Sequence, residues 1–117
     1  MQSRRSALFS RELKKGSTEL LILALLESRP RHGYELGKLI EARSGGRLQF
    51  RVGSLYPILC RLEANSLIVG RWTEKPGERR RRFYRLTAQG RVALARQRSA
   101  WEDFTCAVNQ ILGGEHA

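Results

Sequence analysis

The clearest hydrophobic pattern in the chain follows Gly53-Ser54-Leu55-Tyr56-Pro57. The apolar residues there recur at i, i+3, i+4 and i+7, and they are Leu55, Ile58, Leu59 and Leu62. This spacing predicts a helix with one apolar face. Ser54 is placed to cap it, and Pro57 marks the first turn, where the amide that proline lacks has no intrahelical acceptor.

The pattern changes after Asn65-Ser66. A run rich in β-branched residues extends from Leu67 to Trp72, and a second run extends from Arg81 to Leu86. Between them, Lys75-Pro76-Gly77-Glu78 has the composition of a turn, so we predict a β-hairpin. Alternation along the second strand places Tyr84 and Leu86 on one face, and we assign that face to the core.

Two more helices are predicted upstream. The Leu-rich run 20–26 is ended by Pro30, and a second helix begins near Gly33-Tyr34 and stops at Ser44-Gly45-Gly46. His32 is interpreted as a capping residue of that second helix. Three helices followed by a hairpin are the order of a winged helix-turn-helix, in which the third helix enters the DNA major groove. We therefore predict a mainly α fold with a small β-hairpin, covering residues 16–86.

A long helix is predicted over residues 87–112, with Thr87 as its N-cap and a flexible tail, 113–117, behind it. Its apolar residues follow a 7, 3, 4, 3 spacing, and they are Leu94, Trp101, Phe104, Val108 and Ile111. Such a seam packs against another helix. About 25 residues make a helix of about 37 Å, which is longer than a core this small can cover. A second copy of the chain is the economical partner, and folding back over its own domain is the alternative.

Charge changes the picture of what the fold binds. The 117-residue chain has a formal net charge of +11, and 18 of its 22 basic residues are Arg. The excess lies on a basic N-terminal arm, residues 1–15, and on residues 71–98. The basic residues of that second segment are Arg71, Lys75, Arg79, Arg80, Arg81, Arg82, Arg85, Arg91, Arg96 and Arg98. Such clustering is typical of a nucleic-acid footprint. A solvated cationic surface or an acidic membrane face are the alternatives, but a membrane-surface helix would pair its charges with a large apolar face.

Other chemistry finds little support in the sequence. Cys60 and Cys106 form no CxxC pair, so we predict no metal, no cofactor and two buried or half-buried free thiols. The chain has one Asp, Asp103, and neither a P-loop nor a dinucleotide glycine pattern, so an enzyme is not predicted. The N-terminus lacks the apolar segment of a signal peptide, and no apolar run could cross a bilayer; we predict a cytoplasmic protein without membrane contact.

Several motifs together resemble the PadR family of bacterial transcriptional regulators. They are Leu20-Leu21-Ile22-Leu23, His32-Gly33-Tyr34-Glu35-Leu36, Gly53-Ser54-Leu55-Tyr56-Pro57-Ile58-Leu59 with Arg61-Leu62-Glu63, and Arg82-Phe83-Tyr84-Arg85-Leu86-Thr87-Ala88-Gln89-Gly90. The single C-terminal helix is similar to the short, dimeric subfamily, and its ending is similar to members encoded beside transporter permeases. One departure is Asn65-Ser66, where the family usually has Gly. Because Asn tolerates the left-handed conformation that a helix C-terminus often needs, we expect the turn to be kept.

The resemblance implies a sequence-specific DNA-binding regulator, a repressor acting as a homodimer on a pseudo-palindromic operator of double-stranded DNA. The DNA-contacting residues that it implies are Ser54, Tyr56 and Arg61 on the third helix and Arg79, Arg80, Arg81, Arg82 and Arg85 on the hairpin. Packing against the wing is the alternative role for Tyr56. A constitutive RNA-binding or architectural protein is the alternative function for the same charge.

The resemblance also implies a candidate effector site. In some short members of the family, flat aromatic compounds insert beside a Trp of the C-terminal helix, and Trp101 with Phe104 and Val108 would be the matching site. Plain dimer-core packing is the alternative.

Overall fold

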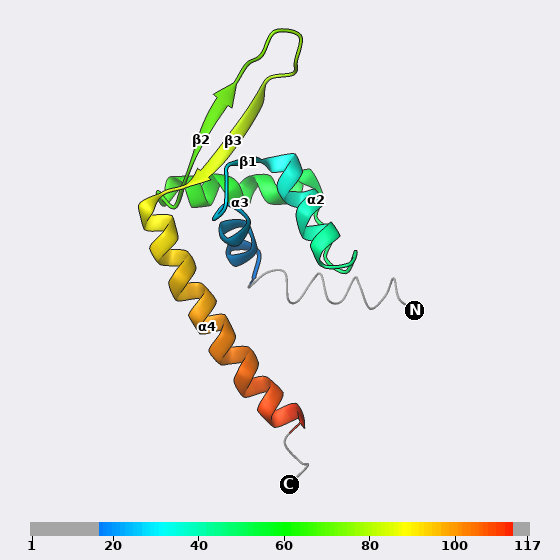
Figure 1. The fold of residues 1–117 in the computed structure, drawn as a ribbon, viewed down its shortest axis with the longest axis vertical. Helices are drawn as coiled ribbons and strands as arrows, with labels where there is room; N and C mark the ends of the chain where they lie inside the picture. The colour runs from blue at the N-terminus through cyan, green and yellow to red at the C-terminus, as the bar shows by residue number, and fades with distance from the viewer. Residues whose placement is uncertain (1–16, 114–117) are drawn as a thin grey trace.

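The computed structural model describes residues 17–113. Residues 17–25 are helical. The elements that follow are β1 (Arg31–His32), α2 (Gly33–Arg43), α3 (Val52–Ala64), β2 (Ile68–Thr73), β3 (Arg81–Leu86) and α4 (Ala88–Gly113). Figure 1 shows the β2–β3 hairpin and α4 projecting in opposite directions from the packed helices. The basic arm and the tail beyond Gly113 lie outside the described residues.

The core forms where the apolar faces of all these elements meet. Leu55, Leu59 and Leu62 of α3 are each at most 2% exposed, which confirms the predicted apolar stripe. The other buried apolar residues are Ile22, Leu23, Leu25, Leu26, Leu36, Ile40, Ile68, Tyr84, Leu86 and Leu94. Tyr84 and Leu86 are thus core residues, as predicted. The winged helix-turn-helix fold class is confirmed.

The sheet has three strands in the order β1-β3-β2, and both pairings are antiparallel. The hairpin was predicted, and Glu78 N–H donates to the Lys75 carbonyl across the predicted turn at 2.9 Å. Strand β1 was not predicted. It pairs Arg31 with Tyr84 and His32 with Phe83, so it joins the start of α2 to the base of the wing.

Two local predictions about the start of α3 are wrong. The helix begins at Val52 after Arg51, so Ser54 lies inside the first turn and does not cap it. Pro57 therefore lies within the helix and not in its first turn. At the other end, Asn65 has an ordinary φ of −88°, and Ser66 adopts the left-handed conformation with a φ of 64°. The turn is retained, but by the neighbouring residue.

The junction between β3 and α4 is held by Thr87. Gly90 N–H donates to Thr87 Oγ1 at 2.9 Å, which confirms Thr87 as a cap, and the Thr87 amide donates to the Leu67 carbonyl at 3.1 Å. Gly90 lies so close to this turn that a Cβ on it would be 2.0 Å from the Leu67 carbonyl oxygen. A residue without a side chain is therefore required where α4 departs from the domain.

Most of α4 has no cover within the described chain. Leu94 is 1% exposed and packs in the core of its own chain, so its assignment to a partner-facing seam is corrected. Beyond it, Trp101 is 41%, Phe104 59% and Ile111 78% exposed. The alternative that α4 folds back over its own domain does not hold (Figure 1). No helix within residues 17–113 is long and apolar enough to span a membrane.

We expect Gly90→Ala to destabilise the protein by about 1–3 kcal/mol, because overpacking against a backbone carbonyl cannot be relieved by a side-chain rotation. Urea unfolding followed by circular dichroism measures the loss. Gly53→Ala is the matched control, since a Cβ there would meet nothing within 4 Å. Alanine at position 53 should leave stability unchanged or raise it by up to about 1 kcal/mol. Equal midpoints for the two variants would contradict the close approach.

Candidate nucleic-acid interface

The outer face of α3 is determined by its buried face. Because Leu55 and Leu59 face the core, the residues at positions 53, 56 and 60 lie on the opposite side, and all three are exposed. Tyr56 is 54% exposed, and Ser54 in the same turn is exposed as well. The structure therefore presents Ser54 and Tyr56 on an accessible helix surface, which is what contact with a DNA groove requires.

Arg61 lies further along α3 and pairs with Glu19 of the first helical segment. Its Nη2 is 2.8 Å from Glu19 Oε2, and the two side chains are 58% and 36% exposed. Ion pairs this accessible contribute little to stability. Arg61 could therefore exchange this carboxylate for a phosphate at small cost.

The arginines of the wing differ in how they are held. Arg79 and Arg85 are exposed. Arg80 pairs with Glu74 at 3.1 Å, and its guanidinium lies 4.6 Å from the ring centroid of Trp72. Both side chains of the Arg80 pair are more than half exposed. These arginines thus form an accessible cationic surface on the hairpin.

Arg82 departs from the expectation of a simple phosphate contact. Its side chain is 25% exposed, and its Nη2 is 2.6 Å from Glu63 Oε2 on α3. The guanidinium also lies over the rings of Trp72 and Tyr84, at 5.5 and 5.7 Å from their centroids. Strand alternation explains the difference, because Arg82 shares the inward face of β3 with Tyr84.

A groove of about 440 Å³ lies between α3, the start of α2 and the wing. Its lining includes Tyr34, Tyr56 and Trp72, together with the arginines from Arg79 to Arg82. The structure thus brings Tyr56 of α3 and four of the five predicted wing arginines to one concave surface. Ser54, Arg61 and Arg85 are not part of this lining.

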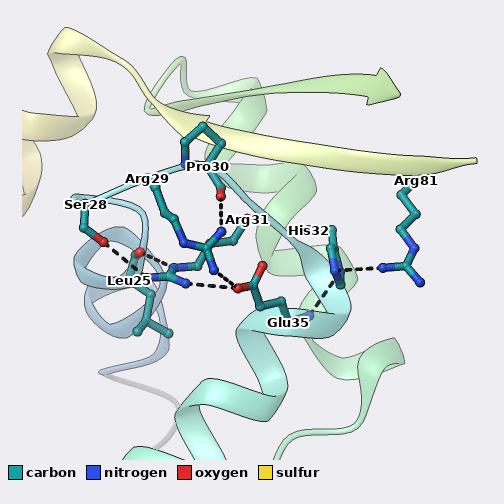
Figure 2. Close-up of polar contacts among 8 residues, drawn as sticks. All are labelled: Leu25, Ser28, Arg29, Pro30, Arg31, His32, Glu35 and Arg81. Carbon is teal, nitrogen blue, oxygen red and sulfur yellow. Dashed lines mark hydrogen bonds and ion pairs between the residues drawn. The ribbon is translucent and has the colours of Figure 1, made fainter. Parts of the chain in front are cut away.

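His32 caps α2 at the edge of the groove. The Glu35 amide donates to His32 Nδ1 at 3.2 Å, which confirms the capping role (Figure 2). Arg81 Nη1 lies 3.1 Å from the other ring nitrogen, Nε2. A neutral imidazole has only one acceptor nitrogen, so a ring that caps through Nδ1 cannot also accept from Arg81. The guanidinium of Arg81 is therefore free to turn toward an anion.

Burial and the nearby positive charge of Arg81 both hold the pKa of His32 below its ordinary value near 6.5. Partial desolvation is the larger cause, and the Glu35 carboxylate opposes it. Since the cap requires an unprotonated Nδ1, the neutral ring is the form that the fold selects.

Arg31 is a buried anchor that the sequence analysis missed. It is 5% exposed, and its Nε donates to the Leu25 carbonyl at 2.7 Å while Nη1 reaches Glu35 at 3.1 Å. Arg29 pairs with the same carboxylate, and Ser28 accepts from Arg31 Nη2 (Figure 2). The only signal in the sequence was the i, i+4 spacing of Arg31 and Glu35. With 22 basic residues in the chain, this spacing did not distinguish Arg31 from the others.

The two cysteines are free and exposed, so the prediction of buried or half-buried thiols is wrong. Cys60 falls outside the apolar stripe of α3, and Cys106 lies on the part of α4 that leaves the domain. Within residues 17–113, no three His, Cys, Asp or Glu side chains gather in a group that could hold a metal ion.

Comparison with known proteins places this geometry among regulators. The sequence model of the Transcriptional regulator PadR-like family matches residues 22–96. Transcriptional regulator Rv3488 of Mycobacterium tuberculosis is 37% identical over 105 residues, covering 90% of this chain and 92% of the relative. The crystal structure of a PadR family regulator from Eggerthella lenta superposes with a TM-score of 0.80 at 26% identity, covering 98% of this chain and 96% of that one.

The structure of Bacillus subtilis PadR in complex with operator DNA shares the fold, with a TM-score of 0.63 at 24% identity. The match covers 68% of this chain and 45% of that longer chain.

We expect acid to weaken the cap of α2. Because the pKa of His32 is lowered in the folded chain, the unfolded chain binds the proton first as pH falls below about 6.5, and stability falls with it. Urea midpoints measured across this range should decline more steeply for the parent than for His32→Asn, whose amide caps without titrating. An identical pH dependence for the two proteins would show that titration of His32 does not cause the loss of stability in acid.

Proposed function

This chain belongs to the PadR-like family of transcriptional regulators, and from that premise we propose that it is a homodimeric repressor that reads a pseudo-palindromic operator. The single observation that carries the proposal is the shared groove. The exposed Tyr56 of α3 and the wing arginines from Arg79 to Arg82 line the same concavity. A helix reads base edges in a major groove while the wing holds the adjoining backbone.

Roles within the surface follow from exposure and reach. Ser54 and Tyr56 are assigned to the groove of the DNA, and Arg79, Arg80 and Arg81 to phosphates. Arg61 and Arg85 are exposed beside this surface and are assigned to flanking phosphates. Arginine suits these roles because its fork matches phosphate oxygens and guanine edges.

The dimer is proposed from the uncovered stripe on α4. Trp101 and Phe104 are in contact, with ring centroids 6.1 Å apart, and both face solvent in the single chain. Trp101, Phe104 and Ile111 are exposed and Val108 is half-buried in the single chain. The row that they form would be covered by the same row of a second copy, which is the self-complementary contact of a two-fold dimer. Leu94 is excluded from this seam because its own domain buries it.

Two finer assignments rest on sequence similarity to the short PadR subfamily. A flat aromatic compound is the proposed effector class, and its site would be Trp101 with Phe104 at the seam. A transporter operon is the proposed target, in the cytoplasm where the chromosome lies. The rival function, RNA binding without sequence preference, is separated by competition: bulk RNA should not displace a selected DNA duplex from this protein at equal nucleotide concentration.

Binding to DNA should depend steeply on salt. If the two wings and arms of a dimer neutralise about 6–10 phosphates, the log-log slope of affinity against salt should be roughly −5 to −9. Arg79→Ala should weaken binding to all sequences and reduce the slope by about 2, one contact per chain. Arg43→Ala, at the far end of α2, is the matched control and should leave the slope unchanged. A parent affinity that barely responds to salt would contradict the proposed interface.

Dimerisation should depend on Trp101. Trp101→Ala and Phe104→Ala remove the exposed aromatic side chains of α4, so both variants should shift toward monomer in sedimentation velocity at micromolar concentration. Val92→Ala is the control, because Val92 is 58% exposed but lies on the opposite side of the helix. Since only a dimer holds two recognition helices about 34 Å apart, the monomeric variants should also lose tight operator binding.

A parent chain that sediments as a monomer would refute the dimer. Variants that remain dimeric and bind DNA, yet no longer respond to planar aromatic compounds, would assign Trp101 to the effector site and not to the seam.

A further inference from the structure

Arg82 is enclosed on several sides at the junction of the wing with α3. Its guanidinium meets the Glu63 carboxylate at 2.6 Å and lies over the rings of Trp72 and Tyr84. The other arginines of the wing, including Arg80 two residues earlier, have no comparable enclosure. This position connects the recognition helix to the hairpin and does not face outward from it.

Gly70 makes the enclosure possible. A Cβ at this position would lie 2.5 Å from Arg82 Nε and 2.7 Å from its Cζ, so any side chain would displace the guanidinium. The amide of Gly70 donates to Glu63 Oε2 at 3.0 Å. One carboxylate oxygen therefore accepts from β2 and from β3 at once.

The position of Glu63 argues for this role. It lies one residue before the end of α3, where a negative charge is unfavourable toward the helix dipole. It also lies close to a surface proposed to bind a polyanion. Both effects disfavour an acidic side chain here. The stabilisation that offsets them must come from the partners of Glu63, which are Gly70 and Arg82.

We propose that Glu63, Gly70 and Arg82 form a joint that sets the angle between α3 and the wing, and that Glu63 is a positioning residue for DNA recognition. The inference rests on the proposed function, because the angle matters only if both elements engage one duplex. Base contacts by α3 and phosphate contacts by the wing form together only when their relative placement fits the DNA. A loose wing must be ordered during binding, which lowers affinity for the correct sequence.

The loss of a negative charge and the loss of a positioning contact predict opposite changes in the DNA affinity of Glu63→Gln. Removing a negative charge beside DNA strengthens binding if Glu63 is a bystander. If the charged carboxylate of Glu63 holds the joint, the variant should bind the selected duplex about tenfold more weakly, while its non-specific binding stays equal or rises. Glu74→Gln is the matched control: it lies on the wing, pairs with Arg80 and is 72% exposed, so its affinity should rise or stay equal.

Two further variants separate the positioning role of the joint from effects of charge and of folding. Gly70→Ala alters no charge and should show the same loss of specific binding as Glu63→Gln. Arg82→Met should lower specific affinity and leave the salt slope at the parent value, whereas Arg79→Ala lowers that slope. A smaller folded fraction would reduce specific and non-specific binding alike, so the ratio of the two is the quantity to compare, beside thermal melts.

The outcomes separate the two proposals. A parent chain that binds no DNA refutes the proposed function. A parent that binds, with Glu63→Gln binding equally or more tightly, overturns the joint alone. An Arg82→Met slope lowered by about 2 would show that Arg82 leaves Glu63 for a phosphate, and this also overturns the joint.

Discussion

Burial of one face of α3 is the constraint on which the rest of the structure depends. Leu55, Leu59 and Leu62 are inserted so fully that the helix cannot rotate without exposing them. Burial of three leucines is worth several kcal/mol, at about 1.5–3 kcal/mol each. The opposite face, with Tyr56 and Cys60, is therefore directed outward by the hydrophobic effect and needs no polar contact to hold it there.

Strand β3 holds the wing beside α3, so that the two elements form one surface. It pairs with β1 on one side and with β2 on the other, and it inserts Tyr84 and Leu86 into the same core. Residues of the opposite face, such as Arg81 and Arg85, remain accessible. The strand ends at the Thr87 cap, so the direction of α4 is set by the element that carries the wing. The proposed base contacts, phosphate contacts and subunit spacing would therefore all depend on the placement of β3.

The sequence predicted elements wherever a period was long enough to be read. The stripe of α3, the hairpin and the length of α4 follow from apolar spacing, and the fold followed from their order. Strand β1 has only two residues, so no alternation could reveal it. Leu94 fits the seam spacing of α4 but lies near its start, where the domain covers it; spacing alone cannot tell which partner buries a residue.

The site residues were predicted less completely because their partners are distant in sequence. The position of Arg82 on a strand could suggest that its side chain faces inward. It could not show that the side chain pairs with Glu63 of α3. Arg31 likewise became significant only when the structure placed the Leu25 carbonyl beside it. Arginines that stabilise the fold and arginines that are free to bind a polyanion look the same in the sequence. Only their tertiary contacts distinguish the two groups.

The outward presentation of α3 to DNA is tested most directly by the two free thiols of the native chain. Cys60 lies on the exposed face of α3, and Cys106 lies on α4; both are accessible. Alkylation by iodoacetamide, followed at each peptide by mass spectrometry, compares them in one protein with and without a saturating duplex selected for tight binding. Bound DNA should slow modification of Cys60 severalfold and leave the modification rate of Cys106 unchanged. Equal rates at Cys60 with and without bound DNA would contradict this presentation of α3.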